Sequence, residues 1–266
     1  MRFKGLALDL DGTFLSGGDK VSAANLAAAR DAQAAGMTVM LATARWHVMA
    51  ERVAAELPTT APLIACSGAQ VRSSEGVDLI DIRLPRAFAA AIYDICNVNR
   101  CVATIPVDEH ALFKLDGDPD LSQMPPGMVH VRRLSLDDGL PRVAIIQGTA
   151  VNDIIERELG PTWSSEVNFA ESISPTGKRN LTLTAKGADK GAALRVACDH
   201  VALDPATVVA FGDAENDIPM FKVAGASFAM GQAKEFVKEA ATAVTLSNED
   251  DGVAAGIRRL LAGEFG

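Results

Sequence analysis

The chain has 266 residues, 48% of them apolar, which is enough to bury a large core in one domain or two. Its net charge is −9 and it has no run of Lys and Arg, which excludes the basic surface that nucleic-acid binding requires. No apolar run approaches the roughly 20 residues that cross a bilayer, and an acidic pair follows the start too closely for a signal peptide. We therefore expect a cytoplasmic protein whose partners are small molecules, and neither nucleic acid nor membrane.

The four cysteines contain no CxxC pair, and three of them lie in apolar segments, where a thiol acts as a small hydrophobic group. We expect free thiols. A disulfide between Cys96 and Cys101 is the less favoured alternative.

The first 70 residues alternate apolar strands with amphipathic helices. A strand is predicted to lead into residues 7–15, ALDLDGTFL, and Ser22 and Gly36 are typical N-cap and stop residues for a helix between them. Further strands are predicted at 38–44 and 62–68, with a helix at 46–57 between them. Continuous apolar strands alternating with helices indicate a parallel sheet covered on both faces.

From about residue 83 to residue 184 the pattern changes to short strands separated by Pro, Gly and Asp turns, which indicates an α+β domain. The expected strands are at 102–107, 111–115, 128–133, 142–148, 167–171 and 180–185, and the expected helices at 85–97 and 151–159.

From Asp189 the earlier alternation of helices and strands returns and continues to the end of the chain. The predicted elements are helices at 189–203, 215–225, 234–241 and 252–262 and strands at 207–211, 226–230 and 243–246. We therefore predict an α/β, doubly wound, Rossmann-like core made of residues 1–82 and 185–266, with residues 83–184 inserted as a second domain.

Polar residues stand where several strands of this core end, the edge at which doubly wound sheets bind ligands. They are Asp9, Asp11, Thr43, Ser67, Asp213, Glu215, Asn216 and Asp217, with Gly68 following Ser67, and Lys190 begins the helix after the insert. Carboxylates that lie close together repel one another, so ionising all of them costs free energy. A bound hard divalent cation lowers this cost. The sequence therefore predicts a Mg²⁺ site.

Mg²⁺, Lys190 and the Thr43 hydroxyl together suit a phosphoryl group, whose oxygens must be neutralised and oriented. One aspartate of the pair could attack phosphorus while the other donates a proton to the leaving alcohol and later activates water. Gly12 would let the chain turn sharply after the strand.

Four segments resemble the motifs of the haloacid dehalogenase superfamily, in particular the Cof-like phosphatases. They are DLDGT at 9–13, Thr43 in LATAR, Lys190 in DKGAAL and GDAENDIPMF at 212–221. The resemblance implies that Asp9 is the nucleophile and Asp11 the general acid and base. It also implies that Thr43 and Lys190 bind the phosphoryl group, and that Asp9, the Asp11 carbonyl and Asp213 hold Mg²⁺.

The other site residues follow from the same resemblance. The substrate-binding set would be Gly12, Thr43, Ala44, Arg45, Ser67, Gly68, Lys190 and Asn216, with Asp217 in support. Asp217 could either orient Lys190 and the metal shell or ligate the metal. The insertion lies between Thr43 and Lys190, which is similar to the type 2B caps of the Cof-like group.

Three positions depart from the pattern common in Cof-like proteins: Ala44 replaces Gly, Ser67 replaces Asn and Gln232 replaces Asn. We expect these three differences to affect the identity of the substrate more than the type of reaction.

We expect a Mg²⁺-dependent phosphatase of small phosphate monoesters, such as sugar phosphates, that forms a phosphoaspartate. The alternatives are a phosphosugar mutase of the same superfamily and a catalytically weak phosphosugar-binding or signalling protein.

Overall fold

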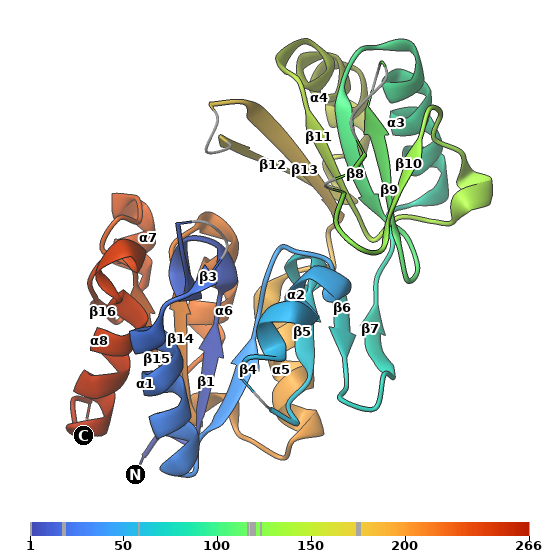
Figure 1. Ribbon diagram of the computed structural model, residues 1–266. Coiled ribbons are helices and arrows are strands. Elements are labelled where there is room, and N and C mark those ends of the chain that lie inside the picture. The colour runs from blue at the N-terminus through green and yellow to red at the C-terminus, as the bar shows by residue number, and fades with distance from the viewer. Residues whose placement is uncertain are drawn as a thin grey trace. The chain divides into compact units, whose positions relative to one another are not determined.

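The computed structural model describes residues 2–17, 20–57, 59–115, 117, 121–122, 124–173 and 177–265. The chain forms two compact units (Figure 1). The first consists of Met1–Ile80 and Asp189–Gly266, and the second, Asp81–Ala188, is inserted between these segments. No helix of the described ranges is long and apolar enough to cross a membrane.

The first unit is built on a five-stranded parallel sheet. Its strands, in spatial order, are β16 (Ala243–Val244), β15 (Ala226–Ala229), β14 (Val208–Gly212), β1 (Gly5–Leu8) and β4 (Thr38–Leu41). β1 lies between β14 and β4, with Leu6 opposite both Val209 and Val39. The neighbours of β1 thus come from opposite ends of the chain, which makes this the switch point where such sheets bind ligands.

Successive side chains of β1 point to opposite faces of the sheet and belong to two different cores. Leu6 and Leu8 belong to the core on one face of the sheet, and Ala7 belongs to the core on the other. All four residues of β1 are buried, as expected for a strand covered on both faces.

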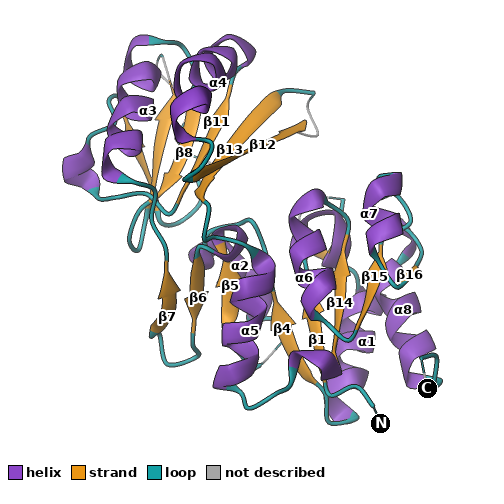
Figure 2. Cartoon of the chain, turned by 180° about the vertical axis from the view of Figure 1, so that it is seen from behind, coloured by secondary structure: helices purple, strands orange, loops and turns teal. Residues whose placement is uncertain are grey.

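Six helices of this unit cover the sheet: α1 (Ala23–Ala34), α2 (His47–Ala54), α5 (Lys190–His200), α6 (Ile218–Val223), α7 (Glu235–Ala240) and α8 (Gly252–Leu261). The cores show that α1, α2 and α8 pack on the face of Leu6, whereas α5, α6 and α7 pack on the face of Ala7. Figure 2, seen from behind, shows α5 and α6 in front of the sheet. The Ser22 side chain caps α1 as predicted, accepting a hydrogen bond from the N–H of Asn25.

A small three-stranded sheet follows α2, formed by β5 (Leu63–Ala65), β6 (Gln70–Arg72) and β7 (Asp78–Asp81). The predicted strand at 62–68 is therefore shorter, and it pairs antiparallel with β6. A single parallel bridge, between Ala42 and Ile64, joins it to the end of β4. The sequence analysis missed β6 and β7 because they are short and polar residues interrupt them.

Other short elements complete the chain. A two-stranded ribbon is formed by β2 (Leu15–Ser16) and β3 (Lys20–Val21), a π-helical turn spans Leu10–Phe14, and 3₁₀ turns span Cys66–Gly68, Leu136–Asp138, Pro205–Thr207, Glu215–Asp217 and Asn248–Asp250. The four cysteines are all buried, and none of them forms a disulfide.

The second unit has a six-stranded sheet with two helices. The strands, in spatial order, are β10 (Met128–Val131), β9 (Ala111–Leu115), β8 (Val102–Pro106), β11 (Val143–Gln147), β13 (Arg179–Ala185) and β12 (Val167–Ile173), and the helices are α3 (Arg86–Val98) and α4 (Thr149–Trp163). Both helices share one core with one face of this sheet, where Phe88 and Ile155 meet Ile146 and Leu181.

The other face of this sheet carries no charged side chain on its strands, within the residues described. Directly opposite residues on neighbouring strands share a face, so Thr104, Phe113, Ile145 and Thr182 form one row across it. The face consists of Met128, His130, Ala111, Phe113, Leu115, Val102, Thr104, Pro106, Val143, Ile145, Gln147, Asn180, Thr182, Thr184, Asn168, Ala170 and Ser172. We call this surface the neutral face.

Candidate active site

The predicted nucleophile lies at the switch point of the parallel sheet. β1 ends at Leu8, and the N–H of Asp9 donates to the carbonyl of Phe211 on β14 at 3.0 Å. Asp9 is only 5% exposed, and Asp213 follows the end of β14. The structure thus brings together carboxylates that are about 200 residues apart in the sequence.

Lys190 forms ion pairs with two carboxylates of the site, those of Asp9 and Asp217. It is the first residue of α5, its side chain is fully buried, and its Nζ lies 2.6 Å from Asp9 Oδ1 and 2.6 Å from Asp217 Oδ1. Burial alone would lower the pKa of Lys190, but the charges of Asp217 and Asp9 raise it. Lys190 is therefore a permanent cation that holds Asp9 in place.

Asp217 uses both of its oxygens within the protein. Oδ1 accepts from Lys190, and Oδ2 accepts from the N–H groups of Asp213 and Ala214, each at 3.0 Å. Its side chain is fully buried. Of the two interpretations left open for Asp217, this geometry supports the one in which it orients Lys190 and the loop of Asp213.

The loop after β1 is pressed against Asp213. Gly12 has φ +77°, and a Cβ at this position would lie 2.5 Å from Oδ2 of Asp213. The Thr13 hydroxyl donates to Oδ1 of the same carboxylate at 3.2 Å. Glycine is required here for the backbone conformation and for space, because L side chains rarely adopt this φ.

Thr43 lies in the loop after β4 and is fully buried. Its hydroxyl oxygen accepts from the N–H of Arg45 at 3.0 Å, which leaves its own proton to be donated. The N–H groups of Thr43, Arg45 and Ser67 are already bonded within the protein, to Ile64, Thr43 and Thr43 respectively. Ala44 has no positive φ, so replacing the glycine of the family pattern introduces no backbone strain there.

The loop of Ser67 and Gly68 supports both Thr43 and Lys190. Its residues Cys66, Ser67 and Gly68 have φ of 51°, 56° and 93°, a run of left-handed conformation in which two residues are not glycine. The N–H of Ser67 donates to the carbonyl of Thr43 at 3.0 Å. A Cβ on Gly68 would clash with the carbonyl of Asp189, immediately before Lys190, so this loop and the start of α5 touch through their backbones.

Asp11 is more exposed than the other carboxylates of the site. Its side chain is 55% exposed and forms a two-point ion pair with Arg45, in which Nη2 contacts Oδ1 and Nε donates to Oδ2 at 2.8 Å. Arg45, which the family resemblance predicts to bind substrate, pairs with Asp11 in the structure.

Gln232 makes a contact that its sequence position did not predict. Its Nε2 donates to the carbonyl of Gly12 at 2.5 Å, and its Oε1 accepts from the N–H of Asn248 at 3.1 Å. The glutamine side chain, which is longer than the asparagine of the family pattern, thus connects the loop after β1 to a loop near the C-terminus. Only the departure from the family pattern marked this residue.

The donor set fits a hard divalent cation. Asp9, Asp213 and Asp217 present oxygens within 4.8 Å of one another, and Oδ1 of Asn216 in the same loop is buried without a hydrogen-bond partner among the described residues. Burial and the charge of Asp217 raise the pKa of Asp213 to about 6, and burial raises that of Asp9 although Lys190 opposes it. Oxygen ligands and unrelieved carboxylate repulsion together favour Mg²⁺.

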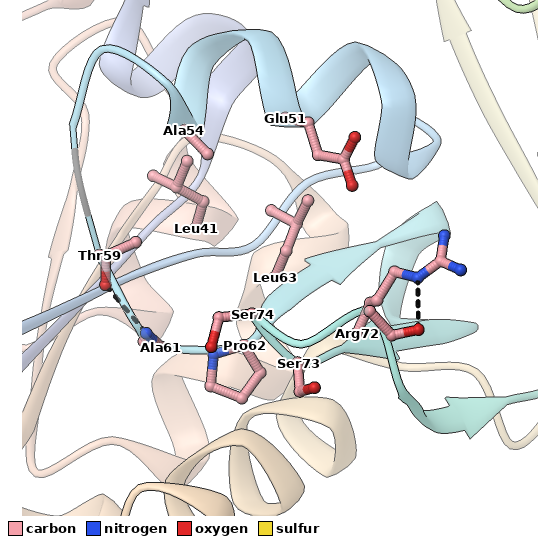
Figure 3. A pocket seen from close by; sticks show the side chains of 11 residues that line it. Leu41, Glu51, Ala54, Thr59, Ala61, Pro62, Leu63, Arg72, Ser73 and Ser74 are labelled. Carbon is pink, nitrogen blue, oxygen red and sulfur yellow. Dashed lines mark hydrogen bonds between the residues drawn. The ribbon is translucent and has the colours of Figure 1, made fainter.

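A cavity of about 250 Å³ in the same unit is separate from these residues. It lies between α2 and the β5–β6 hairpin, and Leu41, Glu51, Thr59, Leu63 and Arg72 are among the side chains that line it (Figure 3). None of the predicted site residues lines this cavity.

Comparisons with known proteins show which family the chain resembles. The family model for haloacid dehalogenase-like hydrolases matches residues 6–257. The chain is 28% identical to the 5-amino-6-(5-phospho-D-ribitylamino)uracil phosphatase YcsE of Bacillus subtilis, over 95% of this chain and 94% of that protein.

Solved structures show the same fold over nearly the whole chain. A crystal structure from Thermotoga maritima is 26% identical, with a TM-score of 0.79 and 97% of each chain covered. A haloacid dehalogenase-like hydrolase from Bacteroides thetaiotaomicron is 24% identical, with a TM-score of 0.79 and 97% and 99% covered.

Proposed function

Because the chain belongs to the haloacid dehalogenase-like hydrolases and is a phosphatase, we propose that it hydrolyses small phosphate monoesters with Mg²⁺, through a phosphoaspartate on Asp9. The observation that carries this proposal is the buried cluster of Asp9, Lys190 and Asp217 beside Asp213 at the switch point. Lys190 orients one oxygen of Asp9, which leaves the other to attack phosphorus.

In the first half of the reaction, an oxygen of Asp9 attacks phosphorus and the ester P–O bond breaks. The bonding electron pair goes to the leaving oxygen, which takes a proton from the Asp11 carboxyl group. In the second half, water attacks phosphorus, the bond between phosphorus and Asp9 breaks, and Asp11 takes the proton of the water. Phosphate leaves and Asp9 is regenerated.

The other residues of the site bind and orient the phosphoryl group. The Thr43 hydroxyl and Lys190 contribute donors, and the backbones of Gly12, Ala44, Ser67 and Gly68 shape the loops around it. Asp9, the Asp11 carbonyl and Asp213 would hold Mg²⁺, with Asn216 and Asp217 in support. Mg²⁺ would supply positive charge that neutralises phosphoryl oxygens and keeps Asp9 ionised.

We assign the inserted unit, Asp81–Ala188, as a type 2B cap that selects the substrate. The name of YcsE describes a substrate with one phosphate on a ribityl chain, which supports a phosphorylated polyol or sugar as the substrate class here.

Phosphate release from p-nitrophenyl phosphate and from a panel of phosphorylated sugars and polyols tests the proposal. We expect Mg²⁺-dependent turnover that the Asp9→Asn variant abolishes. Isomerised sugar phosphate without free phosphate would identify a mutase. Binding of a phosphosugar without turnover would identify a binding protein.

A further inference from the structure

Arg45 and Asp11 form the most exposed charged contact of the site, and the described mechanism does not use it. We propose that Arg45 is a positioning residue for Asp11, which directs the proton toward the leaving oxygen. This inference rests on the proposed function, because it assigns a role within the same reaction.

Asp11 has nothing else to orient it. Its side chain is 55% exposed, and Arg45 is its only side-chain partner among the described residues. An exposed carboxylate without this partner would sample several side-chain rotamers, and ordering it for proton transfer would cost conformational entropy.

Arg45, by contrast, is held firmly. Its N–H donates to the Thr43 hydroxyl oxygen at 3.0 Å, its carbonyl accepts from the N–H of Cys66 at 2.8 Å, and its side chain is only 15% exposed. The backbone of Arg45 is therefore held in place, and its side chain extends from the loop after β4 to Asp11 in the loop after β1.

The two-point contact determines an orientation and not merely a distance. A guanidinium that uses Nε and Nη2 lies in the plane of the carboxylate and approaches from one side. Each carboxylate oxygen keeps a second lone pair, which can carry the proton that passes to the leaving oxygen. A lysine could supply the same charge but would not impose this geometry.

The same contact argues against Arg45 as a direct ligand of the phosphoryl group. The two guanidinium nitrogens that would grip two phosphoryl oxygens are engaged with Asp11. Thr43, after the end of β4, and Lys190, which contacts Asp9, provide donors where the phosphoryl group is proposed to bind.

Two substrates with different leaving groups distinguish a residue that positions Asp11 from a residue that binds the phosphoryl group. An alkyl phosphate needs its leaving oxygen protonated, whereas p-nitrophenolate leaves without a proton. The value of kcat/KM reports on the steps up to the first departure of the leaving group, so both substrates should be measured with the wild type, Arg45→Met and Arg45→Lys. We expect Arg45→Met to lower kcat/KM for the alkyl ester roughly 10- to 100-fold more than for the nitrophenyl ester.

Arg45→Lys should show the same selective loss, because it keeps the charge and removes the two-point contact. A second experiment uses the double variant that combines Arg45→Met with Asp11→Asn. If Arg45 acts through Asp11, the double variant should lose no more alkyl phosphatase activity than Asp11→Asn alone. Inhibition by inorganic phosphate should be unchanged in Arg45→Lys.

Arg259→Met is the matched control, since it removes an exposed two-point pair with Glu264 elsewhere in the same unit. Equal losses for both esters, weaker phosphate inhibition, or additive losses in the double variant would overturn the proposal and identify Arg45 as a phosphoryl ligand. If the wild type hydrolyses neither ester, the proposed function itself fails. Urea unfolding of each variant shows whether a loss reflects folding.

Discussion

The two units place their charged side chains differently. In the first unit Asp9, Lys190 and Asp217 are buried at the carboxyl ends of the parallel strands, where two ion pairs join them. In the second unit the neutral face has no charged side chain on its described strands, and one cluster of charged side chains lies near Asp81, where this unit begins. No candidate site residue lies on the neutral face.

The charged cluster near Asp81 has a structural role within the second unit. Asp81 accepts from Nε of the buried Arg142 at 2.7 Å and from Nη2 of Arg83 at 2.8 Å, and Arg83 also pairs with Asp108 at 2.8 Å. Burial would raise the pKa of Asp81, but the hydrogen bonds from Arg83 and Arg142 lower it. The cluster ties the entry of this unit to the loop after β8.

The largest expected effect comes from the nucleophile. Asp9→Asn keeps an acceptor for Lys190 but removes the attacking carboxylate, so we expect kcat for p-nitrophenyl phosphate to fall by roughly 10³-fold or more. A substitution on the neutral face, such as Thr182→Val, should instead leave p-nitrophenyl phosphate turnover within the same order of magnitude, because no candidate site residue lies on that face. Loss of p-nitrophenyl phosphate turnover in Thr182→Val would break this division between the units.

The next largest effect concerns the buried lysine. Lys190→Met leaves the Asp9 and Asp217 carboxylates buried without their cation, so we expect the free energy of unfolding to fall by about 3–5 kcal/mol, together with loss of activity. The control is Arg157→Ala, which removes an exposed pair with Glu158 in the second unit and should cost less than about 0.5 kcal/mol. Urea unfolding measures both, and similar losses would contradict the account.

Gly68→Ala tests the backbone contact beneath Lys190. The substitution combines an unfavourable φ of +93° with a clash against Asp189, so we expect a loss of about 3 kcal/mol or more and reduced activity. Gly36→Ala is the matched control, since Gly36 also has a positive φ but no atom lies within 4 Å of the added Cβ. It should cost about 1 kcal/mol, from backbone strain alone. Equal costs would show that the contact is unimportant.

The pH dependence of stability tests the metal site. Asp213 has its pKa raised from 3.8 to about 6, so the folded protein binds this proton more tightly than the unfolded chain. The stability of the metal-free protein should therefore fall as pH rises between these values, by up to about 3 kcal/mol. Mg²⁺ should raise Tm above pH 6 and lose this effect near pH 4. Asp213→Asn should reduce both changes but not abolish the first, because the pKa of the Asp9 carboxyl is also raised by burial. Changes as large as those of the wild type would assign them to groups other than Asp213.

The main elements could be predicted because their patterns are local. Ser22 and Gly36 flank the predicted helix, which the structure places at Ala23–Ala34. The strand of residues 111–115 has the predicted ends. The alternation of helices and apolar strands likewise predicted the doubly wound sheet. β6 and β7 could not be predicted in this way, because their stability comes from pairing with each other and with β5.

The clustering of Asp9 and Asp213 could also be predicted, because parallel strands bring their carboxyl ends to one edge, whereas Lys190 at the start of a helix is assigned to the site through the family resemblance. The pairing of Asp11 with Arg45 and the reach of Gln232 to Gly12 could not. Both are hydrogen bonds of long side chains between loops that are distant in sequence, and no local pattern specifies such contacts.

The central claim is that Asp9 carries the phosphoryl group during turnover. Acid quenching during turnover of a substrate with labelled phosphate, followed by peptide mapping, tests it most directly. The account predicts acid-stable, base-labile label on the peptide that contains Asp9, and no label in Asp9→Asn. Label on another residue, or a wild-type enzyme that turns over substrate rapidly without ever becoming labelled, would contradict it.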